Sequence, residues 1–171
     1  TDSIIFTSWI KSKVEKKFSH AVFFFIDQHL NLSKKGMIKK INEISNENKI
    51  STGFFQGDYL SLIDYDFISS VKLNNKYFYL TDDFDMHEIN THTALACDGI
   101  LSCCPISVLR YKEKGLNAHF IFHESDERIF KNLNIEKDID VLFFGALKAN
   151  RAKYINKLRD SNINFKVVGP A

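Results

Sequence analysis

The sequence has little of several things that mark specialised proteins. Two prolines, seven glycines and one tryptophan among 171 residues exclude a collagen-like or proline-rich chain. Three cysteines, with Cys103 and Cys104 adjacent, do not make a disulfide scaffold. The longest apolar run, residues 21–26, is far shorter than the roughly 20 residues of a membrane-spanning helix. We therefore expect a cytoplasmic protein with reduced thiols and no transmembrane segment.

Several well-known functional motifs are missing as well. The chain has no Gly-x-Gly-x-x-Gly, Walker or Gly-x-Ser-x-Gly loop and no paired Cys-x-x-Cys, which argues against a standard dinucleotide enzyme, a P-loop ATPase, a serine hydrolase and a zinc ribbon. The net charge of +2 is too balanced for a protein that coats nucleic acid. Because the chain starts at Thr1 with neither Met nor a signal peptide, we expect residues before it.

The composition is that of a globular protein, with 44% hydrophobic and 26% charged residues. Apolar runs predict strands at residues 4–7, 21–26, 50–55, 67–71, 77–80, 99–103, 118–122, 141–144 and 165–168. Helical patterns predict helices at residues 33–46, 85–96 and 105–114, and a last helix with an apolar face of Leu147, Tyr154, Ile155 and Leu158. Ser33 is the expected N-cap of the first, and Ile106 and Leu109 the expected apolar face of the third.

Strands that alternate with helices are typical of βαβ units, which form a parallel sheet with helices on both faces. The fold class that we predict is therefore α/β and Rossmann-like. The apolar pattern lapses near residues 131–138, so we place one domain at residues 1–135 and the start of a second at residues 136–171. A single β-α-β segment is too small to hold a core alone.

Three acids directly follow the strand predicted at residues 77–80: Asp82, Asp83 and Asp85. The carboxyl ends of strands face the ligand crevice of an α/β sheet, and carboxylates there bind a hard metal or act as a general base. Asp83-x-Asp85 also matches the Asp-x-Asp with which many metal-dependent glycosyltransferases hold a nucleotide diphosphate. The alternative is a set of acids that favours a helix N-terminus.

Histidine supplies a second candidate. His123 follows the strand predicted at residues 118–122 and could be a base, could bind sugar or phosphate, or could be a surface histidine in a loop. The spacing of His87 and His92 does not favour a shared metal, and the cysteines lack the spacing of ligands, so we expect no tightly bound zinc.

The third candidate is the turn that follows the strand predicted at residues 141–144. Gly145, a short loop and Arg151 near the start of the next helix make a plausible phosphate-facing arrangement. The alternative is an ordinary βα turn with a solvated arginine.

The order of parts in the second half resembles a known family. The motifs are residues 79–83, 97–102, 111–115, 123–130 and 140–145 with Arg151 downstream. Together, over about residues 77–169, they resemble the bacterial GT-B glycosyltransferases grouped with the CgeB spore-maturation proteins. No glycine-rich first loop of such a family is visible here.

The resemblance implies two Rossmann-like domains that face a cleft, with the acceptor on the N-terminal domain and the nucleotide sugar on the C-terminal one. Asp82, Asp83 and His123 would face the cleft from the acceptor side, with Asp83 or His123 as the base. Gly145 and Arg151 match the opening loop of the donor domain, where Arg151 would contact the diphosphate. The chain would then be the acceptor domain with only the first β-α-β of the donor domain, and alone would bind nucleotide sugar weakly or not at all.

The expected function is transfer of a sugar from a nucleotide-sugar donor, which is a substrate, to a glycan or protein acceptor, with no bound cofactor and no nucleic-acid partner. Two alternatives stay open. One is a metal-dependent glycosyltransferase that uses Asp83 and Asp85, and the other is a non-catalytic α/β binding module.

Overall fold

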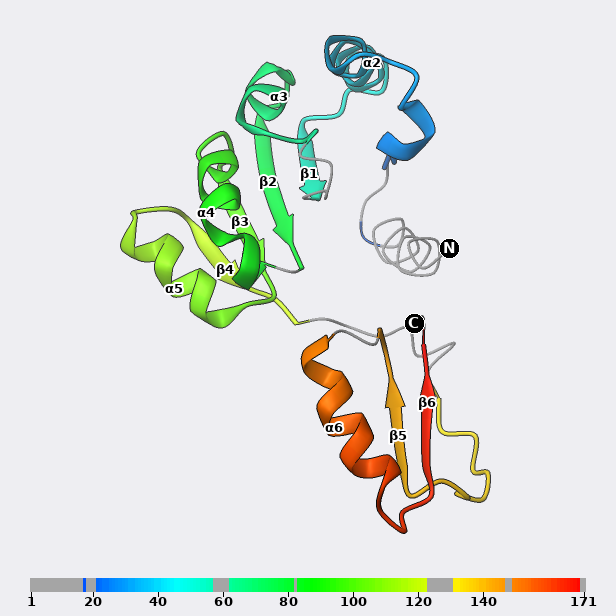
Figure 1. Ribbon diagram of the computed structural model, residues 1–171. Coiled ribbons are helices and arrows are strands. Elements are labelled where there is room, and N and C mark those ends of the chain that lie inside the picture. Colours follow the sequence, from blue (N-terminus) through cyan, green and yellow to red (C-terminus); the bar gives the residue numbers. More distant parts are fainter. Residues whose placement is uncertain are drawn as a thin grey trace. The chain divides into compact units, whose positions relative to one another are not determined.

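The computed structural model describes residues 17, 21–56, 62–81, 83–122, 131–146 and 149–169. The chain divides into two compact units, Thr1–Asp126 and Glu127–Ala171, each with its own parallel sheet (Figure 1). The protein is therefore α/β, as the sequence predicts, and the four-stranded parallel sheet of the first unit is consistent with a Rossmann-like fold.

The sheet of the first unit has the order β1-β2-β3-β4, and its strands are β1 (Thr52–Gln56), β2 (Asn75–Leu80), β3 (Gly99–Ser102) and β4 (Ala118–Phe120). Phe55 pairs in register with Phe78, and Phe78 with Ile100. Since side chains alternate between the faces of a sheet, these three lie in one row on one face. All three are buried and form the centre of the hydrophobic core.

The helices of the first unit are the 3₁₀-helix η1 (Ile26–His29) and the α-helices α2 (Lys34–Glu47), α3 (Tyr65–Ser70), α4 (Asp83–Ala94) and α5 (Pro105–Glu113). Each α-helix contacts the next one along the chain. Strands in sequential order with right-handed crossovers place the connecting helices α3, α4 and α5 on one face of the sheet. Figure 1 shows these helices beside the sheet, and the buried apolar side chains of α3 and α5 belong to the same core cluster as the row on the strands.

Local signals explain where α2 begins and where α5 begins and ends. The hydroxyl of Ser33 accepts a hydrogen bond from the backbone N–H of Gly36 at 3.1 Å, which confirms Ser33 as the N-cap of α2. Pro105 starts α5, where its missing N–H costs nothing. Gly115 follows the end of α5 with φ of +77°, a conformation that favours glycine.

Three predictions from the sequence are wrong. Residues 67–71 were expected to form a strand, but they lie mostly in α3, because Asp64 caps a helix there. Residues 21–25 have no regular secondary structure and lead into η1, although Phe24 and Ile26 do pack against the core. Ile106 and Leu109 are exposed, and α5 buries Ser107, Val108 and Tyr111 instead. The strand predicted at residues 4–7, as well as Leu147, lies outside the described residues.

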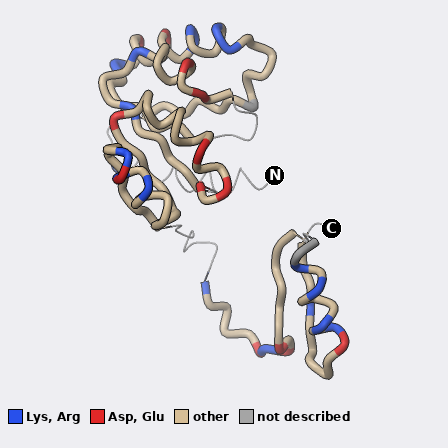
Figure 2. Tube along the Cα trace, turned by 60° about the vertical axis from the view of Figure 1, so that its left-hand side comes forward, with Lys and Arg blue, Asp and Glu red and all other residues tan. Residues whose placement is uncertain are grey.

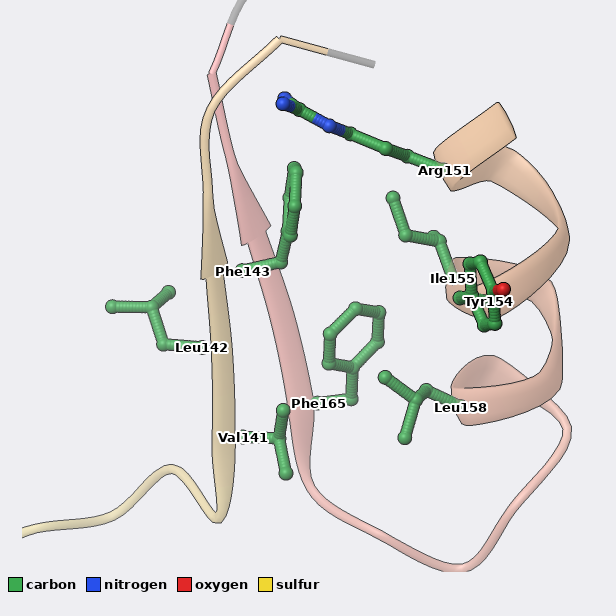
Figure 3. A pocket seen from close by; sticks show the side chains of 8 residues that line it. All are labelled: Val141, Leu142, Phe143, Arg151, Tyr154, Ile155, Leu158 and Phe165. Carbon is green, nitrogen blue, oxygen red and sulfur yellow. The ribbon is translucent and has the colours of Figure 1, made fainter. Parts of the chain in front are cut away.

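The second unit contains the strands β5 (Val141–Phe144) and β6 (Phe165–Val168), which pair in parallel, and the helix α6 (Ala149–Arg159). Residues 131–139 precede them without regular secondary structure. Val141, Phe143 and Phe165 alternate with more exposed side chains along the strands and line the side toward Ile155 of α6 (Figure 3).

Charged side chains of both signs are distributed along the described chain (Figure 2). This agrees with the net charge of +2. Helix α6 differs, because its four charged residues are all basic: Arg151, Lys153, Lys157 and Arg159.

One charged side chain, that of Asp64, links two helices. It caps α3 by accepting a hydrogen bond from the N–H of Phe67 at 2.9 Å, and it pairs with the ammonium of Lys34 at the start of α2. Burial by itself raises the pKa of Asp64, but the contacts with Lys34 and the Phe67 N–H outweigh burial and hold this pKa below its usual value.

We expect Asp64→Ala to lower the free energy of unfolding by about 1 kcal/mol at neutral pH, because it removes the N-cap. The folded-state pKa of Asp64 is below the unfolded one, so its contribution is present above about pH 4 and is lost as the pH falls through the folded-state value. Urea unfolding of both proteins at several pH values measures this difference. Asp66→Ala, at an exposed acid in the first turn of α3, is the control and should cost less. A difference between Asp64→Ala and the unmodified chain that persists in acid would contradict the assignment.

Candidate functional site

Asp83 is the first residue of α4 and lies just beyond the carboxyl end of β2. Its side chain is 1% exposed. One carboxylate oxygen accepts hydrogen bonds from the hydroxyl of Tyr111 at 2.7 Å and the amide of Asn90 at 3.0 Å, and the other accepts from the hydroxyl of Ser102 at 2.8 Å. We call Asp83, Asn90, Ser102 and Tyr111 the Asp83 cluster. It joins β3, α4 and α5 at one edge of the sheet.

The geometry of the Asp83 cluster is that of a structural contact. A general base must reach the proton that it removes, whereas the Asp83 carboxylate is buried and engaged by three donors. Burial raises the pKa of the Tyr111 phenol, and the hydrogen bond to Asp83 raises it further, so the phenol stays a donor. Asp83 therefore positions other groups at this edge, and its role as a base stays a prediction.

Two further polar side chains are buried beside the cluster. The ring of His87 is 3% exposed and lies 4.5 Å from the Tyr111 ring, between centroids. Neither of its ring nitrogens has a hydrogen-bond partner among the described residues, and neither does the hydroxyl of Ser107, which is fully buried. Such groups are costly to bury.

The acids do not form a shared metal site in the described residues. Asp85 is exposed, whereas Asp83 is buried, so the two carboxylates lie in different surroundings. Within the described ranges, no group of three or more His, Cys, Asp or Glu side chains is placed to hold a metal ion. Asp82 and His123 lie outside the described residues, so their predicted roles stay predictions.

The carboxyl edge of the second sheet is built from two glycines. Gly145 follows β5 with φ of +147° and Gly169 follows β6 with φ of +153°. The N–H of Gly145 donates to the carbonyl oxygen of Val168 at 2.9 Å. A Cβ atom at Gly169 would lie 2.2 Å from the carbonyl oxygen of Gly145, so only glycine fits there. The two strand ends therefore approach each other as bare backbone.

Arg151, in the first turn of α6, extends toward this edge (Figure 3). Its Nη1 donates a hydrogen bond to the carbonyl oxygen of Ala146 at 3.0 Å, and its guanidinium carbon lies 5.9 Å from the centroid of the Phe143 ring. These contacts use one of the five guanidinium donors, and the side chain is exposed. We call Gly145, Arg151 and Gly169 the glycine–arginine edge.

A cavity of about 220 Å³ lies next to Arg151, between the sheet and α6. Apart from Arg151 and the hydroxyl of Tyr154, the side chains that face it are apolar: Val141, Phe143, Ile155, Leu158 and Phe165 (Figure 3). A polar ligand would gain little inside it, so the glycine–arginine edge is the part of this unit suited to an anion.

Sequence reasoning located Asp83, Gly145 and Arg151 but missed the partners of Asp83. For two of these partners, the sequence does contain a signal. Ser102 is a polar residue at the end of an apolar strand, and Tyr111 lies four residues after Ser107 on the same face of a helix. Both patterns indicate polar groups directed into a core, where each needs a partner.

No known protein family matches this sequence, and neither does any curated protein. Among the described residues, no helix has both the length and the apolar character needed to cross a membrane.

The Asp83 cluster can be tested through stability. We expect Asp83→Asn to lower the free energy of unfolding by about 3 kcal/mol, because the amide turns one acceptor into a donor facing buried donors. Asp85→Asn, two residues along the same helix and exposed, should change it by less than about 0.5 kcal/mol. Chemical denaturation of the three chains measures both effects. An Asp83→Asn chain as stable as the unmodified one would instead favour a functional carboxylate that the fold does not need.

Proposed function

We propose that this chain is part of a GT-B glycosyltransferase, which moves a sugar from a nucleotide-sugar donor to a glycan or protein acceptor, and that the glycine–arginine edge contacts the donor diphosphate. The observation that carries the proposal is the pairing of bare strand ends at Gly145 and Gly169 with the guanidinium of Arg151. Glycine lets a phosphate approach the backbone closely, and arginine binds phosphate through charge-assisted hydrogen bonds.

The charge of α6 supports an anionic ligand. A cation in the first turn of a helix opposes the helix dipole, and this turn carries Arg151 and no acid. An anion bound beyond the N-terminus would reverse that cost, since it would be attracted to both the dipole and Arg151. The basic residues further along α6 add to the attraction at long range.

The reaction needs a leaving diphosphate to be stabilised and an acceptor hydroxyl to be deprotonated. Arg151 and the N-terminus of α6 would supply the first without a metal. His123 is the base that we propose for the second. Asp83 would then hold α4 and α5 in place at the acceptor-side edge. An odd number of cysteines, three in all, is typical of the cytoplasm, where thiols stay reduced.

Backbone amide spectra of the 171-residue chain, titrated with uridine and guanosine diphosphates, test the ligand contact. We expect weak binding that shifts the amide signals of Gly145 and Gly169. Arg151→Ala should weaken binding roughly 10- to 100-fold, through loss of contacts worth on the order of 1.5–3 kcal/mol. Arg159→Ala, which removes the same charge from the last turn of α6, is the matched control and should have a much smaller effect.

Two results would contradict the proposal. One is a nucleoside diphosphate that shifts amide signals only in the first unit, which would place the donor site there. The other is an equal effect of Arg151→Ala and Arg159→Ala, which would mean attraction by charge alone. A third result would favour the non-catalytic binding module. In that case the nucleoside diphosphate binds at the glycine–arginine edge, but a longer protein that contains this chain transfers no sugar.

A further inference from the structure

The cavity between the β5–β6 sheet and α6 is apolar but not closed. Ile155 is buried, whereas four other side chains that face the cavity are only half-buried: Val141, Phe143, Leu158 and Phe165. Water in an apolar space gains few hydrogen bonds, so an apolar ligand displaces it favourably. The cavity of about 220 Å³ is therefore suited to an apolar group that enters from solvent.

One end of this cavity carries a positive charge. Arg151, Ile155 and Leu158 follow one another at spacings of four and three residues and so lie on one face of α6. Arg151 and Leu158 are about 10 Å apart along the helix axis. Figure 3 shows the guanidinium at one end of the row of apolar side chains and Val141 with Leu158 at the other. The cavity is thus an apolar space beside α6 with a cation at one end.

The guanidinium of Arg151 has donors to offer a ligand. Its Nη1 donates to the carbonyl oxygen of Ala146 at 3.0 Å, and the ring of Phe143 lies beneath it. Among the described residues, no carboxylate forms an ion pair with it. A guanidinium binds a carboxylate through two parallel hydrogen bonds, and one cation balances one negative charge. The charge at this end therefore matches a carboxylate.

The volume sets the size of the apolar part. An apolar cavity of about 150 Å³ holds benzene, with its six carbons, so the cavity of about 220 Å³ suits roughly eight. We propose that this cavity binds a medium-chain carboxylate of about eight carbons, with its alkyl chain between the sheet and α6 and its carboxylate on Arg151. The inference does not depend on sugar transfer, although this ligand and a donor diphosphate would compete for Arg151.

A series of carboxylates of increasing chain length tests the fit. Octanoate, added to the 171-residue chain, should shift the side-chain methyl signals of Val141, Ile155 and Leu158 in NMR spectra. Hexanoate should bind roughly 15-fold more weakly, because each buried methylene group contributes a factor of about four. Decanoate should gain less than about fourfold over octanoate, since its chain exceeds the space. An affinity that rises by the same factor beyond eight carbons would indicate adsorption to an open surface and overturn the proposal.

The charge is tested with octanol, which has the same chain and no carboxylate. Arg151→Ala should weaken octanoate binding at least about tenfold and leave octanol binding nearly unchanged. Arg159→Ala, at the other end of α6, is the matched control and should change neither by more than about twofold. Equal effects of the two substitutions on octanoate would overturn the assignment of the carboxylate to Arg151.

A substitution that fills the cavity separates this ligand from the diphosphate. Val141→Phe, at the end remote from Arg151, should weaken octanoate binding at least about tenfold and leave the diphosphate shifts of Gly145 and Gly169 in place. Leu142→Phe, on the face turned away from α6, is the matched control and should bind octanoate normally.

The amide spectrum shows whether each variant folds, and the chain-length series needs no variant. Octanoate that binds with the expected dependence on chain length and charge supports the inference even where nucleoside diphosphates do not bind. Equal octanoate binding by the Val141→Phe and Leu142→Phe chains, or octanoate that shifts no methyl signal of the second unit, would overturn it.

Discussion

A buried carboxylate, that of Asp83, accepts hydrogen bonds from β3, α4 and α5 at once. A charge out of water is tolerated only when hydrogen bonds replace its hydration, so these three elements must keep their relative positions for the unit to remain folded. Among the described residues, Tyr111 has the largest fully buried side chain, and its hydroxyl donates to the same carboxylate. Helix α5 packs against β3 and β4. This packing and the polar contact at the sheet edge therefore form together.

The carboxyl edges of the two sheets are built on different principles. In the first unit, the polar side chains nearest the strand ends are buried, and most of them hydrogen-bond to one another. In the second unit, the strand ends carry glycine, and the arginine beside them keeps most of its donors exposed. Fixing a fold requires donors and acceptors to be paired, whereas binding a ligand requires donors that are still free. This contrast is why we propose the ligand contact at Gly145 and Arg151.

Much of the fold could be predicted from the sequence, because β2, β3 and β5 are apolar runs bounded by turns and α2 and α5 have clear start signals. The segment at residues 67–71 could not, since a short apolar run suits a strand or a buried helix equally. There the N-cap of Asp64 decided the outcome. The position of Asp83 was predictable from the strand before it. Its role was not, because its partners Ser102 and Tyr111 come from distant parts of the sequence that only folding brings together.

The outer face of the β5–β6 sheet affects how this protein can be handled. Leu142 and Phe144 are exposed, Phe144 by 79%, and within the described residues each of these strands pairs only with the other. An apolar face beside open strand edges is a template for unwanted strand addition. The purified chain should therefore lose solubility as its concentration or the temperature rises, well before the first unit unfolds. The substitution Phe144→Lys would place a charge on this face and oppose such aggregation. The face is separate from the Asp83 cluster and from the glycine–arginine edge.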